Sequence, residues 1–355
     1  MAKVPERDGQ AVACSTEQTQ LGEGIRWDDR RGELLAVDIL AGRVARGLLR
    51  EDGLIERVGV YQLPETVGMV APIQGDDGWI LGAGRGFVHL ALDGTQRTIA
   101  QVAPAGTRMN DGACDPQGRF WGGTLANDHH TGGGALYRLD RTGQTEVMLE
   151  DLTISNGIGW SPDGRTMYLV DSGPRVVHAF TFDGDRGTIS AGRVLVTVPE
   201  DIGAPDGMTV DAAGDLWVAI YGGGRVNRYA PDGSLRDVYP IPARVCTCCA
   251  FGGPGLHQLF VTTATEGWTD EQRRADLDAG PQEAAHQPVL AGQRAGRGTR
   301  PGAGRRAAVR GGTHRGPHPR PGLVDPGLRG DRPRQPAAQH TPGHRRARVR
   351  PGPAR

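Results

Sequence analysis

The feature that most constrains the fold is a short pattern that recurs along the first 280 residues. A polar residue is followed five positions later by Asp or Ser, then by a glycine-containing turn and an apolar strand-like segment. Clear copies begin at Glu23, Asn110, Asn156 and Asp206, which are 87, 46 and 50 residues apart. A period of roughly 40–50 residues is typical of propeller blades, each of which is one small antiparallel sheet.

Two further copies complete the series. The long first gap contains a turn at 70–78 followed by the apolar segment 79–83, and a turn at 246–253 precedes the apolar segment 259–263. The apolar segments of the other units are 33–38, 119–124, 166–171 and 215–220. Second strands then lead to dipeptides such as Thr142-Gly143 and Asp232-Gly233, which join antiparallel strands. No long stripe of helical period occurs, so we expect little helix.

Six units in register predict an all-β fold, a six-bladed β-propeller that occupies residues 1–280. A generic β-sandwich is the alternative, and it does not explain the common register of the units. The sixth unit lacks a recognisable second strand after Thr263, and from Pro281 onward Arg, Gly, Pro and Ala dominate. We therefore predict an incomplete last blade, and an N-terminal strand near 10–14 that lacks its intended neighbours.

The C-terminal segment 281–355 differs in composition from the rest of the chain. It has 16 Arg against three acidic residues, 12 of the 25 Pro and no aromatic residue. Its net charge of +13 cancels a charge of −13 on residues 1–280. So few large apolar side chains cannot offset the entropy of ordering. We interpret it first as the product of a shifted reading frame, second as a disordered extension, and last as a nucleic-acid-binding arm, since it lacks stacking aromatics.

Several functional classes are excluded by the same inspection. The sequence contains no run of 18 apolar residues, so it predicts no membrane-spanning helix. The charged N-terminus does not resemble a secretory signal. The five cysteines have no metal-finger spacing. An acidic propeller argues against nucleic acid as a partner, and we expect a cytoplasmic protein with no membrane partner. The sequence does not predict an oligomeric state.

In a propeller, loops that enter the innermost strands converge at one end of the central channel. Glu23, Asn110, Asn156 and Asp206 should therefore meet there, and all four can offer oxygen atoms. Any one of them alone could be an ordinary turn residue, but four at matching repeat positions favour a site. Oxygen ligands suit one divalent cation, namely Ca²⁺, Mg²⁺ or Mn²⁺, with Zn²⁺ also possible.

These residues resemble a known family. The matching segments are Leu21-Gly-Glu-Gly24, Arg108-Met-Asn-Asp-Gly112, Ile154-Ser-Asn-Gly157, Pro205-Asp-Gly207 and Cys248-Cys-Ala-Phe-Gly-Gly253. Over about residues 15–270 the chain resembles the SMP-30/gluconolactonase/luciferin-regenerating-enzyme family, whose regucalcin-like members are six-bladed propellers. The resemblance implies hydrolysis of sugar lactones such as gluconolactone.

The resemblance also implies roles for individual residues. Family metal ligands correspond to Glu23, Asn156 and Asp206, and contacts to substrate hydroxyls correspond to Arg108 and Asn110. A further substrate contact, usually Glu in the family, falls near Asp128, which is a shorter acid.

We therefore expect a metal-dependent lactonase. A divalent ion would polarise the lactone carbonyl and lower the pKa of a bound water. Asp206 is the candidate general base, which would take a proton from the attacking water and pass it to the ring oxygen. The alternative is a non-catalytic propeller that binds Ca²⁺ or a small molecule.

Overall fold

The computed structural model describes residues 11–15, 17–271, 274 and 289–291. These residues fold almost entirely as β-strands, and the predicted all-β class is confirmed. Helix within this part of the chain is limited to the 3₁₀ turn η1 (Pro254–Leu256) and a segment that begins at residue 270. None of the helices described is long and apolar enough to cross a membrane.

Five sheets each consist of four consecutive antiparallel strands, the arrangement of propeller blades. In the first, β2 (Gly22–Asp28), β3 (Glu33–Asp38), β4 (Arg43–Leu49) and β5 (Ile55–Gln62) lie in order. The second contains β6 (Val67–Pro72), β7 (Trp79–Ala83), β8 (Gly86–Leu90) and β9 (Gln96–Gln101). The third contains β10 (Thr107–Cys114), β11 (Phe120–Ala126), β12 (Gly134–Leu139) and β13 (Thr145–Leu152).

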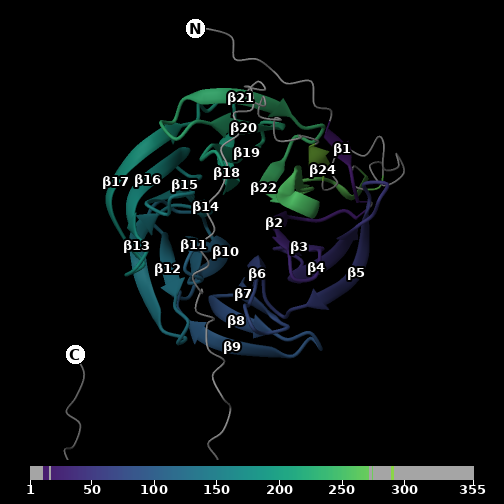
Figure 1. Ribbon diagram of the computed structural model, residues 1–355, viewed down its shortest axis with the longest axis horizontal. Helices are drawn as coiled ribbons and strands as arrows, with labels where there is room; N and C mark the ends of the chain where they lie inside the picture. The colour runs from purple at the N-terminus through teal and green to yellow at the C-terminus, as the bar shows by residue number, and fades with distance from the viewer. Residues whose placement is uncertain (1–10, 16, 272–273, 275–288, 292–355) are drawn as a thin grey trace, which may run out of the picture. The chain divides into compact units, whose positions relative to one another are not determined.

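The fourth and fifth sheets follow the same order. They contain β14 (Ser155–Trp160), β15 (Thr166–Asp171), β16 (Val176–Asp183) and β17 (Thr188–Thr197), then β18 (Ala204–Val210), β19 (Leu216–Tyr221), β20 (Arg225–Tyr229) and β21 (Leu235–Pro240). The sheets lie around a common centre, with the first strand of each sheet innermost (Figure 1).

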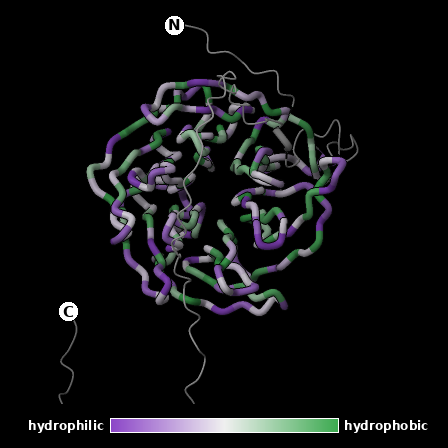
Figure 2. The backbone as a smooth tube through the Cα atoms, viewed as in Figure 1, coloured by the Kyte–Doolittle hydropathy of each residue, from purple (hydrophilic) through white to green (hydrophobic). Residues whose placement is uncertain are grey.

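The strand sequences follow their depth in each sheet. All five residues of β7 are buried, as expected for a strand covered on both faces, whereas the outer strand β5 contains only half-buried and exposed residues. Hydrophobic and hydrophilic residues accordingly intermix along the chain instead of forming long segments (Figure 2). The predicted hairpin turns are present, with positive φ at Gly94, Gly143 and Gly233, a conformation that glycine adopts without strain.

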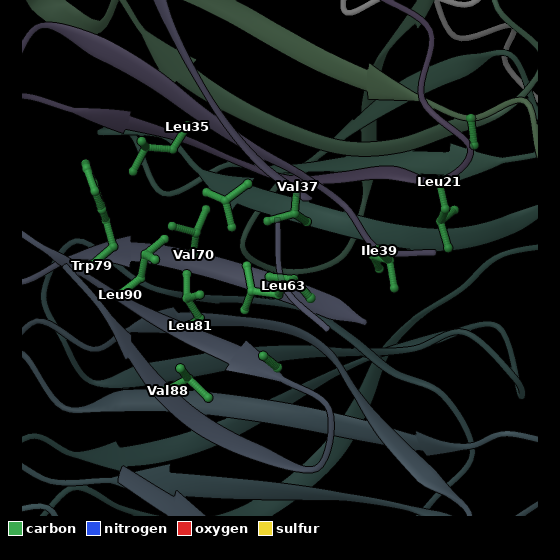
Figure 3. Packing of buried hydrophobic residues seen from close by; sticks show 14 of the residues in the cluster. Leu21, Leu35, Val37, Ile39, Leu63, Val70, Trp79, Leu81, Val88 and Leu90 are labelled. Atoms are coloured by element: carbon green, nitrogen blue, oxygen red, sulfur yellow. The ribbon is translucent and has the colours of Figure 1, made fainter. Parts of the chain in front are cut away.

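Apolar side chains fill the spaces between neighbouring sheets. The cluster between the first two sheets includes Leu35, Val37, Val70, Trp79 and Leu81, which face one another in Figure 3. Comparable clusters lie between each later pair of neighbours, and one links the sheet of β22 to the first sheet. The core is therefore distributed around the centre.

The Asp that lies five positions after the start of the repeat has a structural role. The Asp115 carboxylate accepts a hydrogen bond of 3.1 Å from the Trp121 indole, and Asp211 accepts one of 2.9 Å from Trp217. Each carboxylate also accepts backbone N–H groups of its own turn. This half of the repeat fixes the turn between the innermost and second strands.

The sixth sheet is assembled from both ends of the described chain. Its order is β1 (Ala11–Ala13), β24 (Val289–Ala291), β23 (Gln258–Thr263) and β22 (Cys246–Gly252). The sequence-based expectation of an incomplete last blade, with an N-terminal strand that lacks its neighbours, differs from this finding. Val12 pairs with Leu290, which in turn pairs with Phe260. The three apolar residues of β24 supply the third strand, and so short a run is easily overlooked in an Arg- and Pro-rich context.

The predicted boundary after residue 280 remains untested. Apart from 289–291, the segment 281–355 lies outside the described residues, and its interpretation as a disordered or frameshifted tail stays a prediction.

Candidate functional site

Each innermost strand carries an irregularity near the position that begins the repeat. The pairing of the innermost with the second strand shifts register once in every sheet, at Glu23/Arg26, Val67/Met69, Met109/Gly112, Ser155/Ile158, Pro205/Met208 and Cys246/Cys249. A bulge inserts residues that have no partner in the ladder and re-aims their side chains. Asn110, Asn156 and Asp206 lie within these bulges, and Glu23 lies at the edge of one. The bulges therefore let these side chains meet near the centre.

Side-chain hydrogen bonds join three of the four predicted oxygen positions across neighbouring sheets. The Asn110 amide nitrogen donates to the Ser155 carbonyl oxygen at 3.0 Å. The Asn156 amide nitrogen donates to the Asp206 carboxylate and, at 3.0 Å, to the Ser172 hydroxyl. Residues that lie 45 and 50 positions apart in the chain are thus brought together, as the repeat predicts.

Glu23 and Asp206 form an excess of buried negative charge. Their exposed fractions are only 4% and 5%. Burial raises the pKa of the Glu23 carboxyl well above its usual range, and the charges of Asp206 and Asp111 raise it further. Burial also raises the pKa of Asp206, followed by the charge of Asp111, while the hydrogen bond from Asn156 opposes the shift. Two such buried carboxyls within electrostatic range of each other favour the binding of a cation.

Arg108 lies beside these acids. Its guanidinium donates a 2.8 Å hydrogen bond to the Asn110 amide oxygen. Burial lowers the pKa of Arg108, although the charges of Glu23, Glu266 and Asp206 act in the opposite direction. Arg108 and Asn110, the two predicted substrate contacts, are therefore a hydrogen-bonded pair next to the carboxylates.

Asp128 has different surroundings. Its side chain is 75% exposed on the turn after β11 and shares a 2.6 Å hydrogen bond with the His130 ring. That hydrogen bond lowers the pKa of Asp128. The structure does not bury Asp128 with the other predicted residues, and its role as a substrate contact stays a prediction.

Asp111 is a functional candidate that the sequence analysis does not single out. Its carboxylate is 2% exposed, accepts the Gly112 N–H at 2.7 Å and lies 3.9 Å from the Arg26 guanidinium. Its second oxygen is buried without a hydrogen-bond partner in the described structure. Burial raises the pKa of Asp111, and the charge of Arg26 opposes this shift.

Tyr221 and Glu266 form a second unforeseen pair. The Tyr221 hydroxyl, at the end of β19, donates to the Glu266 carboxylate at 3.2 Å. Burial, followed by the charge of Glu266, raises the pKa of Tyr221 to about 12. Glu266 is exposed, and its charge acts on both Asp206 and Arg108. This pair therefore lies within electrostatic range of the carboxylate cluster.

The available donors fit a hard cation better than a zinc-finger type of site. The described residues contain no cluster of three or more His, Cys, Asp and Glu side chains that could hold a metal. The set here is instead two carboxylates and an amide. The Asn156 amide oxygen is buried and has no hydrogen-bond partner within the described structure. An unpartnered amide oxygen beside two buried carboxylates matches the oxygen ligands that Ca²⁺ and Mg²⁺ prefer.

Residues 21–265 match the family described as the SMP-30/gluconolactonase/LRE-like region. That span is more than half of the chain and contains all the innermost strands of the five blades. The chain belongs to the SMP-30/gluconolactonase/LRE-like family. The family resemblance that the sequence motifs predict is therefore confirmed.

Similar proteins within the SMP-30/gluconolactonase/LRE-like family include named lactonases. The chain is 36% identical to pentonolactonase XacC of Haloferax volcanii over 69% of this chain and 82% of that protein. It is 35% identical to 6-deoxy-6-sulfogluconolactonase of Pseudomonas putida over 74% and 90%. Regucalcin of Danio rerio is 34% identical over 74% and 90%.

Solved structures agree with this membership of the SMP-30/gluconolactonase/LRE-like family. A calcium-binding protein, regucalcin, from Agrobacterium tumefaciens is 28% identical, with a TM-score of 0.71 over 80% of this chain and 95% of that one. A luciferin-regenerating enzyme is also 28% identical, with a TM-score of 0.67 over 78% and 94%.

Asp111 and Glu266, which the sequence analysis does not single out, differ in whether any pattern in this SMP-30/gluconolactonase-like sequence could have identified them. Asp111 directly follows Asn110, whereas the equivalent positions after Glu23, Asn156 and Asp206 are all Gly. That contrast marks Asp111 as unusual and could have identified it. Glu266 follows the sixth unit and has no counterpart in the repeat, so no pattern in the sequence points to it.

Proposed function

We propose that this chain is a divalent-metal-dependent lactonase that opens sugar lactones. The observation that carries the proposal is the meeting of Glu23, Asn156 and Asp206 at one place, with the amide oxygen of Asn156 unpartnered. Family membership supports the reaction class, because similar proteins are named for their action on pentonolactone and sulfogluconolactone.

Glu23, Asn156 and Asp206 are the residues that would hold the cation. Their oxygen donors suit Ca²⁺, Mg²⁺ or Mn²⁺, and Zn²⁺ is also compatible. When bound, the cation supplies Lewis-acid polarisation of the carbonyl group and lowers the pKa of water. A positive charge would also relieve the repulsion between the Glu23 and Asp206 carboxylates.

The protein residues would then position the lactone and move a proton. Asp206 accepts a proton from the water whose oxygen attacks the carbonyl carbon. The ring carbon–oxygen bond breaks, and the same proton passes to the ring oxygen to give a hydroxy acid. Burial raises the pKa of the Asp206 carboxyl, which makes this group a better proton acceptor than an exposed carboxylate. Arg108 and Asn110 hold substrate hydroxyls, and Asp128 would contact the substrate from its exposed turn.

The test is hydrolysis of D-glucono-1,5-lactone, followed by acid release. We expect EDTA to reduce the rate to the uncatalysed background and a divalent cation to restore it. Asp206→Ala should remain at background with the cation present, while Asp201→Ala, at an exposed carboxylate on the loop before β18, should retain the activity. Full activity in both EDTA and Asp206→Ala would exclude the proposed mechanism.

A non-catalytic cation- or ligand-binding propeller is the second candidate. It is favoured by the similarity to a solved structure that is described as a calcium-binding protein, and the same three ligands serve both functions. The two differ in turnover: a binding protein would take up the cation, lose it on Asn156→Ala, and hydrolyse no lactone.

We further propose that the sixth sheet is a sixth blade that closes the propeller. Support comes from the contacts of its innermost strand, β22, with both β18 of the fifth sheet and β2 of the first. The Thr247 hydroxyl in β22 also donates to the Gly22 carbonyl oxygen, which joins the two ends of the series beside Glu23.

A further inference from the structure

Tyr221 is placed beside Asp206 by strand pairing. It is the last residue of β19 and pairs with Ala204, the first residue of β18. Asp206 follows Ala204 by two positions, inside the bulge of β18. The Tyr221 ring therefore projects from the neighbouring strand at the end of the sheet where the bulge places Asp206.

Glu266 is anchored beside the segment that leads to Glu23. Ala264 forms an isolated antiparallel bridge with Leu21. The Thr265 backbone N–H and hydroxyl both donate to the Thr19 carbonyl oxygen, at 3.2 and 2.9 Å. Glu266 is the next residue, so its position is fixed relative to the start of β2 although its side chain is exposed.

The hydrogen bond between these two side chains spans the two carboxylate-bearing strands. The Tyr221 hydroxyl reaches Glu266 from the side of β18, and Glu266 is held from the side of β2. Because the pKa of Tyr221 is about 12, its hydroxyl stays protonated and remains a donor at neutral pH. The charge of Glu266 is felt by Asp206 and Arg108. The exposed Glu266 carboxylate therefore lies within electrostatic range of the buried residues. The positively charged Arg108 side chain among them is already hydrogen-bonded to Asn110.

We propose that Glu266, oriented by Tyr221, determines the charge of the sugar ring that this site accepts, favouring neutral polyhydroxylated lactones over those that carry an anionic substituent. The inference rests on the proposed function for the class of ligand. The Glu266 carboxylate accepts hydrogen bonds from sugar hydroxyls and repels a carboxylate on the ring. Repulsion between like charges several ångströms apart in a partly solvated site changes affinity by roughly fivefold.

The test measures binding of two lactams that cannot turn over as lactones do. D-Glucono-1,5-lactam is neutral, and D-glucaro-1,5-lactam has the same ring with a carboxylate in place of the terminal hydroxymethyl group. Calorimetry on the full chain should give tighter binding of the neutral lactam. In Glu266→Gln the neutral-to-anionic affinity ratio should fall by roughly fivefold, and added salt should reduce the difference between variant and parent.

Matched variants separate charge from structure. Glu266→Asp keeps the charge and should keep the ratio. Glu200→Gln removes another exposed glutamate, paired with Arg175 at 3.1 Å, and should leave the ratio within twofold. Tyr221→Phe should weaken both lactams by a similar factor, because Glu266 keeps its charge but loses its donor.

The outcomes for this inference and for the proposed function are distinct. An unchanged ratio in Glu266→Gln, or no binding of either lactam to the parent chain, overturns the inference even if lactones are hydrolysed. A ratio that falls as expected while D-glucono-1,5-lactone is not hydrolysed upholds the inference about the binding site and rejects the lactonase.

Discussion

Asn156 and Asn110 occupy the same repeat position, but their amide groups have different surroundings. The Asn110 oxygen accepts from Arg108 and its nitrogen donates to Ser155, so both ends of the amide are satisfied. The Asn156 nitrogen donates to Asp206, while its buried oxygen has no hydrogen-bond partner in the described structure. Only Asn156 therefore has an acceptor available for a cation, whereas Asn110 is held in a polar framework.

This difference predicts opposite effects of two alanine substitutions. Asn156→Ala should weaken divalent-cation affinity by at least about tenfold, as loss of a ligand or its close support does in metal sites. Asn110→Ala should change cation affinity by no more than about threefold and should instead raise KM for a sugar lactone. Calorimetric titration with Ca²⁺, Mg²⁺, Mn²⁺ and Zn²⁺ measures the first effect. Equal losses of cation affinity in both variants would contradict these separate roles.

At the residue scale, the repeat predicts which side chains lie close together but not which hydrogen-bond partners each of them has. The convergence of Glu23, Asn156 and Asp206 is predictable because equivalent positions of a radial fold lie close together, while their roles stay predictions. Glu266 acts through its charge across sheets, which a linear pattern does not contain. Asp111 leaves a local signal, an Asp where the equivalent positions are Gly, but its burial beside Arg26 is set by the fold. Asp128 is a different case. Its predicted role comes from the family resemblance alone, and its exposed side chain contacts His130.

At the scale of elements, the bulges in the innermost strands bring the repeat residues of neighbouring sheets together. Gly157 follows Asn156 inside the bulge of β14, against the next innermost strand. A Cβ atom at Gly157 would lie 2.6 Å from the Asp206 carbonyl oxygen and from the Met208 backbone nitrogen. The close approach of these two backbones therefore requires glycine, and it sets the separation of the Asn156 and Asp206 side chains.

We predict that Gly157→Ala destabilises the fold by about 1–3 kcal/mol, because the backbone of β18 must move to admit the methyl group. The matched control is Gly59→Ala in the outer strand β5, where the nearest atom to an added Cβ is 3.4 Å away, at the guanidinium end of the Arg46 side chain. Urea unfolding of both variants measures the change. Equal stability of the two would show that the bulge tolerates a wider separation.

Strand positions are largely predictable because their signals are local. The predicted segments 33–38, 79–83 and 166–171 coincide with β3, β7 and β15. Apolar runs and glycine turns can be recognised from residues that are neighbours in the sequence. The bulges are not predictable in this way, because they depend on the register between two strands. The short strand β24 is also missed, as three apolar residues give too little pattern to outweigh their surroundings.

At the scale of the whole molecule, the sixth sheet depends on strands from both ends of the described chain. β24 lies between β1 and β23, so it supplies hydrogen bonds to both. Without it, β1 would lose the strand with which it pairs among the described residues, and β23 would present an unpaired edge, a recognised route to aggregation. The predicted boundary after residue 280 therefore falls before the last strand of the described fold, whereas the first Arg of 281–355, Arg294, follows that strand.

We predict that Leu290→Pro in the full chain lowers the melting temperature, because proline cannot donate to the ladder and Leu290 is the central residue of β24, paired with both Val12 and Phe260. Each 1 kcal/mol lost should lower Tm by roughly 2–4 °C for a chain of this size. Leu328→Pro, in the segment beyond the described residues, is the control and should melt like the parent. If Leu290→Pro also melted like the parent, β24 would contribute no stability, and a shifted reading frame that begins before it would be the better account of residues 281–355. A lower melting temperature in Leu290→Pro alone would instead show that residues 289–291 stabilise the fold. Any shift of the reading frame would then have to begin after residue 291.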